Sequence, residues 1–98
     1  MKNVILKWQK TFGISQWDIT TERIDPNQVT YIDSCPPEDR YFIGISKDID
    51  SERGVIYHDR DLYEEAIIHE LLHVRYPDEN EAWIDNRTTE LFQGIVAN

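Results

Sequence analysis

The spacing of apolar positions along the chain predicts an N-terminal helix, a group of short strands and two C-terminal helices. Residues 2–12 place apolar side chains such as Trp8 and Phe12 among lysines, which predicts a short helix that ends near Gly13. Four later segments are rich in β-branched and aromatic residues, and we predict strands over residues 17–24, 29–33, 40–46 and 54–58. Because these strands follow one another with short connections, an antiparallel sheet is favoured over βαβ units.

From Asp61 onward the apolar period becomes helical. Residues 62–76 carry apolar side chains on most faces, which is typical of a buried helix. Asp61 is the expected N-cap, with Glu64 in capping-box spacing, and Pro77 ends the helix. A final helix is predicted over residues 79–93, with Gly94 as its stop. The expected fold is one α+β domain over residues 1–98, with an N-terminal helix, a small mainly antiparallel sheet and two C-terminal helices.

Composition narrows the classes of partner. The net charge of −9 argues against a nucleic-acid partner, which would require clustered Lys and Arg, and suits a basic or extended peptide better. Cys35 is the only cysteine, so no intrachain disulfide is expected and a reducing compartment fits best. The apolar run near the N-terminus is too short for a signal peptide or a membrane span. We therefore expect a soluble cytoplasmic protein.

Candidate chemistry lies on the buried helix, in the run His69-Glu70-Leu71-Leu72-His73. Two histidines four residues apart project from one helix face, so both imidazoles can reach one metal ion at about 2.0–2.1 Å. Glu70 is rotated by about 100° from His69, which places it beside the ligand pair rather than in it. There it can accept a proton from a metal-bound water and pass it to a leaving amine. This pattern predicts a zinc site, with an ordinary amphipathic helix as the alternative.

Glu81 is the expected third ligand. His73 and Glu81 each lie four residues from Pro77, so two helices folded back at this proline would bring them side by side. Glu81 and Asp85 also share the stripe that should face the core, where carboxylates need a partner; Asp85 would then hold a ligand imidazole by its second nitrogen. Several alternatives stay open at this point. Glu81 has capping-box spacing from Asp78, and Asp85, Glu79 or His58 are other possible ligands.

These residues resemble a known group of enzymes. His-Glu-x-x-His followed by Glu-x-x-x-Asp on a second helix looks like the gluzincin clan of zinc metallopeptidases, and the string from Asn80 to Asp85 is similar to its glutamate-helix motif. The size and layout look most like the minimal single-domain members, the minigluzincins. The resemblance covers residues 54–92. The gap between the second histidine and the glutamate is much shorter here than in the thermolysin-like members of the clan.

The resemblance implies a zincin-like fold, with a sheet above the cleft, an active-site helix below it and a second helix behind the metal. By position it implies that His69, His73 and Glu81 bind Zn²⁺, that Glu70 is the general base, and that Asp85 supports a ligand from outside the coordination sphere. It also allows latency imposed by a C-terminal segment, here residues 94–98.

The leading hypothesis is a zinc metallopeptidase whose peptide or protein substrate lies along an edge strand, formed by residues 54–58 or 40–46. A metal-bound water attacks the carbonyl with Glu70 as general base, and Glu70 then protonates the amine. The alternative is a latent or inactive zinc-stabilised binding or regulatory module of the same fold; hydrolysis of a non-peptide amide is a third possibility. The residue that stabilises the oxyanion stays open among Tyr57, His58, Tyr63 and Tyr76.

Overall fold

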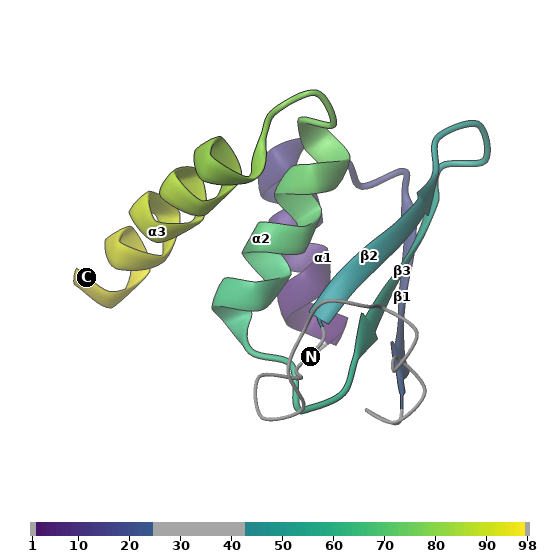
Figure 1. The fold of residues 1–98 in the computed structure, drawn as a ribbon, viewed down its shortest axis with the longest axis horizontal. Coiled ribbons are helices and arrows are strands. Elements are labelled where there is room, and N and C mark those ends of the chain that lie inside the picture. Colours follow the sequence, from purple (N-terminus) through teal and green to yellow (C-terminus); the bar gives the residue numbers. More distant parts are fainter. Residues whose placement is uncertain (1, 25–42, 98) are drawn as a thin grey trace.

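The structure, a computed structural model, describes residues 2–24 and 43–97, with side chains described up to Gly94. The predicted strand over residues 29–33 and Cys35 lie outside the described residues. The elements follow in the order α1 (Lys2–Phe12), β1 (Asp18–Arg23), β2 (Ile43–Asp48), β3 (Arg53–His58), α2 (Glu64–Arg75) and α3 (Glu81–Ala97) (Figure 1). The α+β class and the order of helix, sheet and two helices are therefore confirmed.

The sheet is mixed rather than mainly antiparallel. Its described strands lie in the order β1-β3-β2, so β3 is central and β2 is at an edge. β2 and β3 form the expected antiparallel pair, in which Ile45 faces Ile56, but β1 pairs with β3 in parallel. The expectation failed because, among the described strands, β1 pairs with β3 instead of with β2. The central position of β3 leaves the side chain of Ile56 fully buried.

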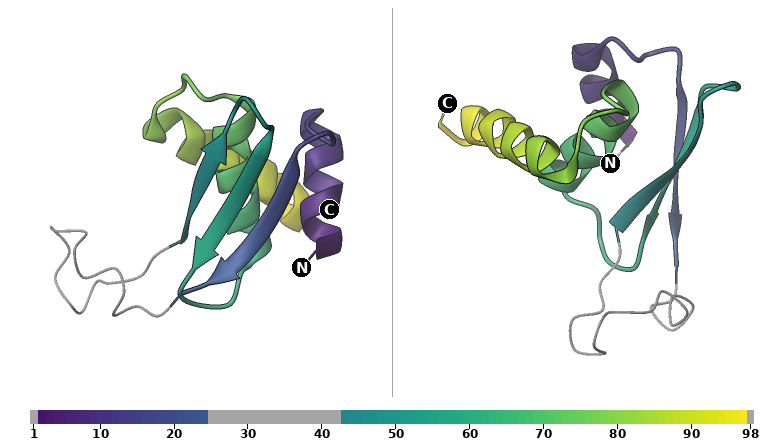
Figure 2. Two further views of the ribbon diagram at one scale, coloured as in Figure 1. Left: turned by 90° about the vertical axis from the view of Figure 1, so that its right-hand side faces the viewer. Right: turned by 45° about the horizontal axis from the view of Figure 1, so that its top comes forward.

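All three helices lie on one face of the sheet (Figure 2). α2 is the central helix, since it contacts α1, α3 and strand β2. Its predicted burial is confirmed: Ile67, Ile68, Leu71 and Leu72 are fully buried, together with Ile84 of α3. α1 adds Ile5 and Trp8 to the same core, and Ile19 and Ile45 of the sheet pack against it. The histidine-bearing helix is therefore held on several sides.

The predicted start of α2 is wrong. The helix begins at Glu64, and its N-cap is Tyr63, which makes no side-chain cap hydrogen bond. The carboxylate of Asp61 instead pairs with Arg23 at 2.9 Å. Glu64 turns towards α1, where its carboxylate accepts hydrogen bonds from Trp8 Nε1 at 2.7 Å and Lys7 Nζ at 3.0 Å. Contacts between elements have replaced the local capping box.

The predicted stop of the last helix is also wrong, because α3 continues through Gly94 to Ala97. A glycine inside a helix costs only about 1 kcal/mol relative to alanine, so the helix can include it. Residue 94 is thirteen residues after Glu81 and lies about 20 Å from it along the helix axis. Within the described residues, no helix combines the length and the apolar composition needed to cross a membrane.

Candidate metal centre

The structure brings His69, His73 and Glu81 together where α2 and α3 approach each other after the turn at Pro77 (Figure 1). The two histidine Nε2 atoms lie 3.3 Å apart. The carboxylate of Glu81 lies between them, with Oε2 at 3.3 Å from His69 Nε2 and Oε1 at 2.7 Å from His73 Nε2. Two adjacent turns of one helix and the first residue of the next therefore meet at a single point.

Two of these three distances fit a tetrahedral zinc ion, and the 2.7 Å contact of Glu81 Oε1 with His73 is shorter. Donors that each lie about 2.0–2.1 Å from a tetrahedral ion are about 3.3–3.4 Å from one another. The two imidazole Nε2 atoms are 3.3 Å apart, and Glu81 Oε2 is 3.3 Å from Nε2 of His69. Two neutral imidazoles and one carboxylate are also a set of donors that zinc prefers in catalytic sites. The residues present therefore fit the ion that the sequence pattern predicts.

The turn between the helices explains why Glu81 reaches the histidines. Asn80 caps α3, because its side-chain oxygen accepts a hydrogen bond from the backbone N–H of Trp83 at 2.8 Å. The rings of Tyr76 and Trp83 pack edge to face across the turn, with centroids 5.0 Å apart. With Asn80 as the cap, Glu81 is the first helical residue and its carboxylate is free to turn towards α2. The alternative role of Glu81 in a capping box with Asp78 is therefore contradicted.

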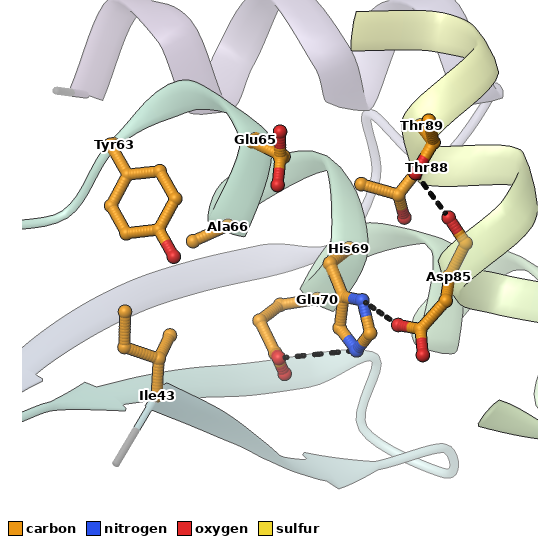
Figure 3. A pocket seen from close by; sticks show the side chains of 9 residues that line it. All are labelled: Ile43, Tyr63, Glu65, Ala66, His69, Glu70, Asp85, Thr88 and Thr89. Atoms are coloured by element: carbon orange, nitrogen blue, oxygen red, sulfur yellow. Dashed lines mark hydrogen bonds and ion pairs between the residues drawn. The ribbon is translucent and has the colours of Figure 1, made fainter. Parts of the chain in front are cut away.

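Asp85 lies one turn after Glu81 and contacts the other nitrogen of His69. Its Oδ1 is 3.2 Å from His69 Nδ1 (Figure 3). A carboxylate in this position favours the tautomer that keeps Nε2 free for an ion. The expectation that both acids are buried is wrong, since the side chains of Glu81 and Asp85 are 67% and 65% exposed. They flank the buried positions Ile84 and Thr88 instead of sharing them.

Glu70 is the buried acid of the site. Its side chain is 7% exposed, and its Oε1 lies 3.9 Å from Nε2 of His69. Burial, together with the negative charge of Glu81, raises the pKa of Glu70 to about 7. A cation bound by Glu81 and the histidines would oppose the second contribution. The carboxylate therefore stands beside the donor group, as the spacing in the sequence predicts.

Lys47 of β2 is a residue of the site that the sequence reasoning missed. Its Nζ donates a hydrogen bond of 2.6 Å to the backbone carbonyl of His73, which ties the edge strand to the C-terminal end of α2. Burial lowers the pKa of His73; the nearby charges of His69 and Lys47 act in the same direction, while Glu81 acts against them. Lys47 and His73 are 26 positions apart in the sequence, so no local signal could predict this contact.

Two hollows adjoin the donor group. The first, which we call the β2 groove, has a volume of about 380 Å³ and lies between residues 43–47 of β2 and the four residues His69, Glu70, His73 and Glu81. The second, the α2–α3 pocket, has a volume of about 360 Å³ and is lined by the nine residues labelled in Figure 3. His69 and Glu70 border both hollows. A molecule bound in either one would therefore lie next to Glu70.

The remaining candidates lie elsewhere in the fold. His58 ends β3, and its Nδ1 is 2.6 Å from the backbone carbonyl oxygen of Arg60. His58 and Glu79 are not in the donor group, which within residues 2–24 and 43–97 consists of His69, His73 and Glu81. Among the four residues considered for an oxyanion, Tyr63 lines the α2–α3 pocket with Glu70, whereas Tyr76 packs against Trp83.

Comparisons with known proteins do not assign the chain to a family. No protein-family model matches it, and no curated protein or solved structure does either. The resemblance to gluzincins therefore stays a prediction from the motifs. The case for the metal centre depends on the residues and distances given above.

Proposed function

We propose that this chain is a zinc-dependent metallopeptidase that hydrolyses peptide bonds. The observation that carries the proposal is the meeting of two imidazoles and one carboxylate at tetrahedral spacing, beside a buried glutamate that is not needed to hold an ion. Structural zinc sites are closed by four protein ligands, whereas catalytic sites use three and keep one position open. The donor group has three members within residues 2–24 and 43–97, and this number supports the catalytic alternative.

His69, His73 and Glu81 would hold the ion. Bound zinc supplies a Lewis acid that lowers the pKa of a water molecule and polarises the scissile carbonyl. Asp85 contributes by orientation: its contact with His69 Nδ1 fixes the imidazole so that Nε2 faces the other two donors. Lys47 contributes by its hydrogen bond to His73, which holds β2 over the same end of α2.

The edge of β2 is the proposed binding surface for the peptide backbone. Of the two segments considered for this role, residues 54–58 lie in β3, in the centre of the sheet, where both neighbouring strands use the backbone groups. Ile43, Gly44, Ile45 and Lys47 of β2 line the groove that contains His69, Glu70 and His73. An extended peptide added to this edge would lie with its backbone carbonyls next to the donor group.

Glu70 is the proposed general base and acid. It takes a proton from the water that attacks the carbonyl carbon, and it delivers that proton to the amine as the C–N bond breaks. Its position supports this role, because it borders both hollows and contacts His69 without being a donor in the metal group. Loss of a general base of this kind reduces rates by roughly 10²- to 10⁴-fold.

The test compares wild type with Glu70→Gln, which keeps the shape of the side chain and removes the base. Zinc content is measured by elemental mass spectrometry, and cleavage by the appearance of new N-termini in a mixture of unfolded peptides. We expect zinc to be retained and cleavage to fall by roughly 10²-fold or more. A chelator should abolish wild-type cleavage, and added zinc should restore it.

Glu79→Gln is the matched control, since this exposed acid lies two residues before Glu81 and outside the donor group. It should retain both zinc and activity. Equal cleavage by wild type and Glu70→Gln would exclude Glu70 as the base. Zinc binding without cleavage by any variant, wild type included, would instead favour a zinc-stabilised binding module.

A further inference from the structure

The lining of the α2–α3 pocket bears on which substrate side chain can bind there, a question that the metal donors do not answer. It extends from His69 and Glu70 towards the start of α2 and the middle of α3, whereas the β2 groove extends towards His73 and Glu81. Figure 1 shows that α2 and α3 diverge from their connecting turn, and the pocket lies where they have moved apart. A substrate side chain beside the scissile bond would therefore enter a space whose lining is set by both helices.

The lining of this pocket is acidic. Among the described residues, its lining contains the carboxylates of Glu65, Glu70 and Asp85 and no lysine or arginine. Asp85 already contacts His69, but the carboxylate of Glu65 forms no hydrogen bond or ion pair with another described residue. Glu65 lies one helical turn before His69, and Figure 3 places it at the border of the pocket. A half-buried carboxylate without a partner favours a positively charged ligand group.

A second observation points the same way. The side chain of Glu70 is more than nine-tenths buried and borders the pocket, and its Oε1 is 3.9 Å from His69 Nε2, beyond hydrogen-bond distance. The described residues contain no enclosed side-chain oxygen without a partner, so the oxygens of Glu70 are open to a molecule that approaches them. A buried carboxylate in this state gains from a donor that enters the pocket. Besides the carboxylates of Glu65 and Asp85, the pocket therefore offers a hydrogen-bond acceptor that is largely buried.

Apolar surface completes the lining. Ile43, Ala66 and the ring of Tyr63 border the same space, and Tyr63 is 49% exposed (Figure 3). Lysine and arginine pack their methylene stems on surfaces of this kind and keep the charged group near an acid. An aromatic face adds attraction for the cation itself. A short or acidic side chain would leave these features unused or be repelled.

We propose that the α2–α3 pocket selects a lysine or arginine side chain next to the scissile bond of a peptide substrate, with Glu65 as the residue that recognises the positive charge. This inference deepens the peptidase proposal and depends on it. The β2 groove differs from this pocket in its charge, because its lining includes the positively charged Lys47. The same basic side chain is therefore disfavoured near Lys47, and this difference helps to set the direction in which the peptide binds.

The experiment uses the zinc-loaded chain and two series of peptides. In one series the residue directly before the scissile bond is varied, and in the other the residue directly after it; all other positions are identical. The varied position carries Lys, Arg, norleucine or Glu, where norleucine has the length of lysine without its charge. The value measured is the ratio of kcat/KM for Lys to that for norleucine. We expect wild type to prefer Lys and Arg, and Glu65→Gln to lower this ratio about two- to fivefold, as expected for a partly exposed ion pair.

Two further variants separate recognition from a general loss of activity. Glu65→Lys should turn the preference away from the Lys and Arg peptides and towards the Glu peptide. Glu22→Gln removes one exposed acid from β1, outside the pocket, and should leave the ratio unchanged. Zinc content and thermal unfolding of each variant show whether the centre and the fold are intact.

The possible failures are distinguishable. Cleavage of all four peptides at similar rates in both series, or an equal ratio in wild type and Glu65→Gln, would overturn the specificity proposal alone. Cleavage of none of the peptides by wild type would overturn the peptidase proposal, and the specificity proposal with it.

Discussion

Asp85 allows a quantitative test of the metal centre. The substitution Asp85→Ala removes the carboxylate that lies 3.2 Å from Nδ1 of His69 and leaves the three proposed ligands in place. Replacement of such an outer partner lowers metal affinity by roughly 10- to 100-fold. The exposure of Asp85 decides where in that range the effect should fall. Its side chain is 65% exposed, so the surrounding medium resembles water more than a protein interior.

The contact energy follows from Coulomb's law. At 3.2 Å in a dielectric like that of bulk water, two unit charges would interact by about 1.3 kcal/mol, which is an upper limit for this contact because the imidazole that binds the ion is neutral. An energy of about 1.4 kcal/mol corresponds to a tenfold change in affinity. We therefore expect Asp85→Ala to weaken zinc binding about tenfold, at the lower end of the range. A buried carboxylate in the same position would give a larger loss.

Competition with a chromophoric zinc chelator at neutral pH measures the affinity. Asn86→Ala, at the next position of α3, which is also exposed, is the control and should bind zinc like wild type. Glu81→Ala removes a proposed ligand and should lose more affinity than Asp85→Ala. Two results would refute the reasoning: an affinity of Asp85→Ala within twofold of wild type, or a loss as large as that in Glu81→Ala, which would make Asp85 itself a ligand.

Two further predictions concern stability. Leu71 is fully buried in α2, so Leu71→Ala should lower the free energy of unfolding by about 2–5 kcal/mol in urea titrations, and a loss below about 1 kcal/mol would contradict the assigned core. Hydrogen bonds from Trp8 and Lys7 hold the pKa of Glu64 below its usual 4.5. Its contribution to stability is therefore complete above pH 4.5 and is lost as the pH falls through the lower pKa of the folded state. Urea titrations at pH 7 and pH 3 should show a smaller acid-induced loss in Glu64→Gln than in wild type; equal losses would count against this contact.

The local features of the fold could be predicted because each depends on a few neighbouring residues. The first helix has the predicted bounds of residues 2–12, and Gly13 follows it with a φ of 72°, a conformation that glycine adopts without strain. The burial of α2 could be predicted from its apolar side chains on most faces. The position of the two histidines on one face follows from helix geometry alone.

Interactions between elements could not be predicted in the same way. Asp61 and Glu64 have good capping-box spacing, yet ion pairs and hydrogen bonds with β1 and α1 take their side chains elsewhere. The parallel pairing of β1 with β3 depends on how the chain returns to the sheet, which local patterns do not encode. Packing between elements that are distant in sequence also places Lys47 at the site.

The sequence by itself determined the His-Glu-x-x-His face, because a helix places residues four apart on one side whatever surrounds it. It also contained a signal that the reasoning overlooked: Asn80 is a favourable N-cap directly before Glu81. Tertiary structure alone decided which acidic side chain contacts the histidines and which one lies in solvent. That choice depends on the turn capped by Asn80, on the approach of α3 to α2, and on the tie from Lys47 to His73. These distances are set by packing across the core, and periodicity along the chain carries no information about them.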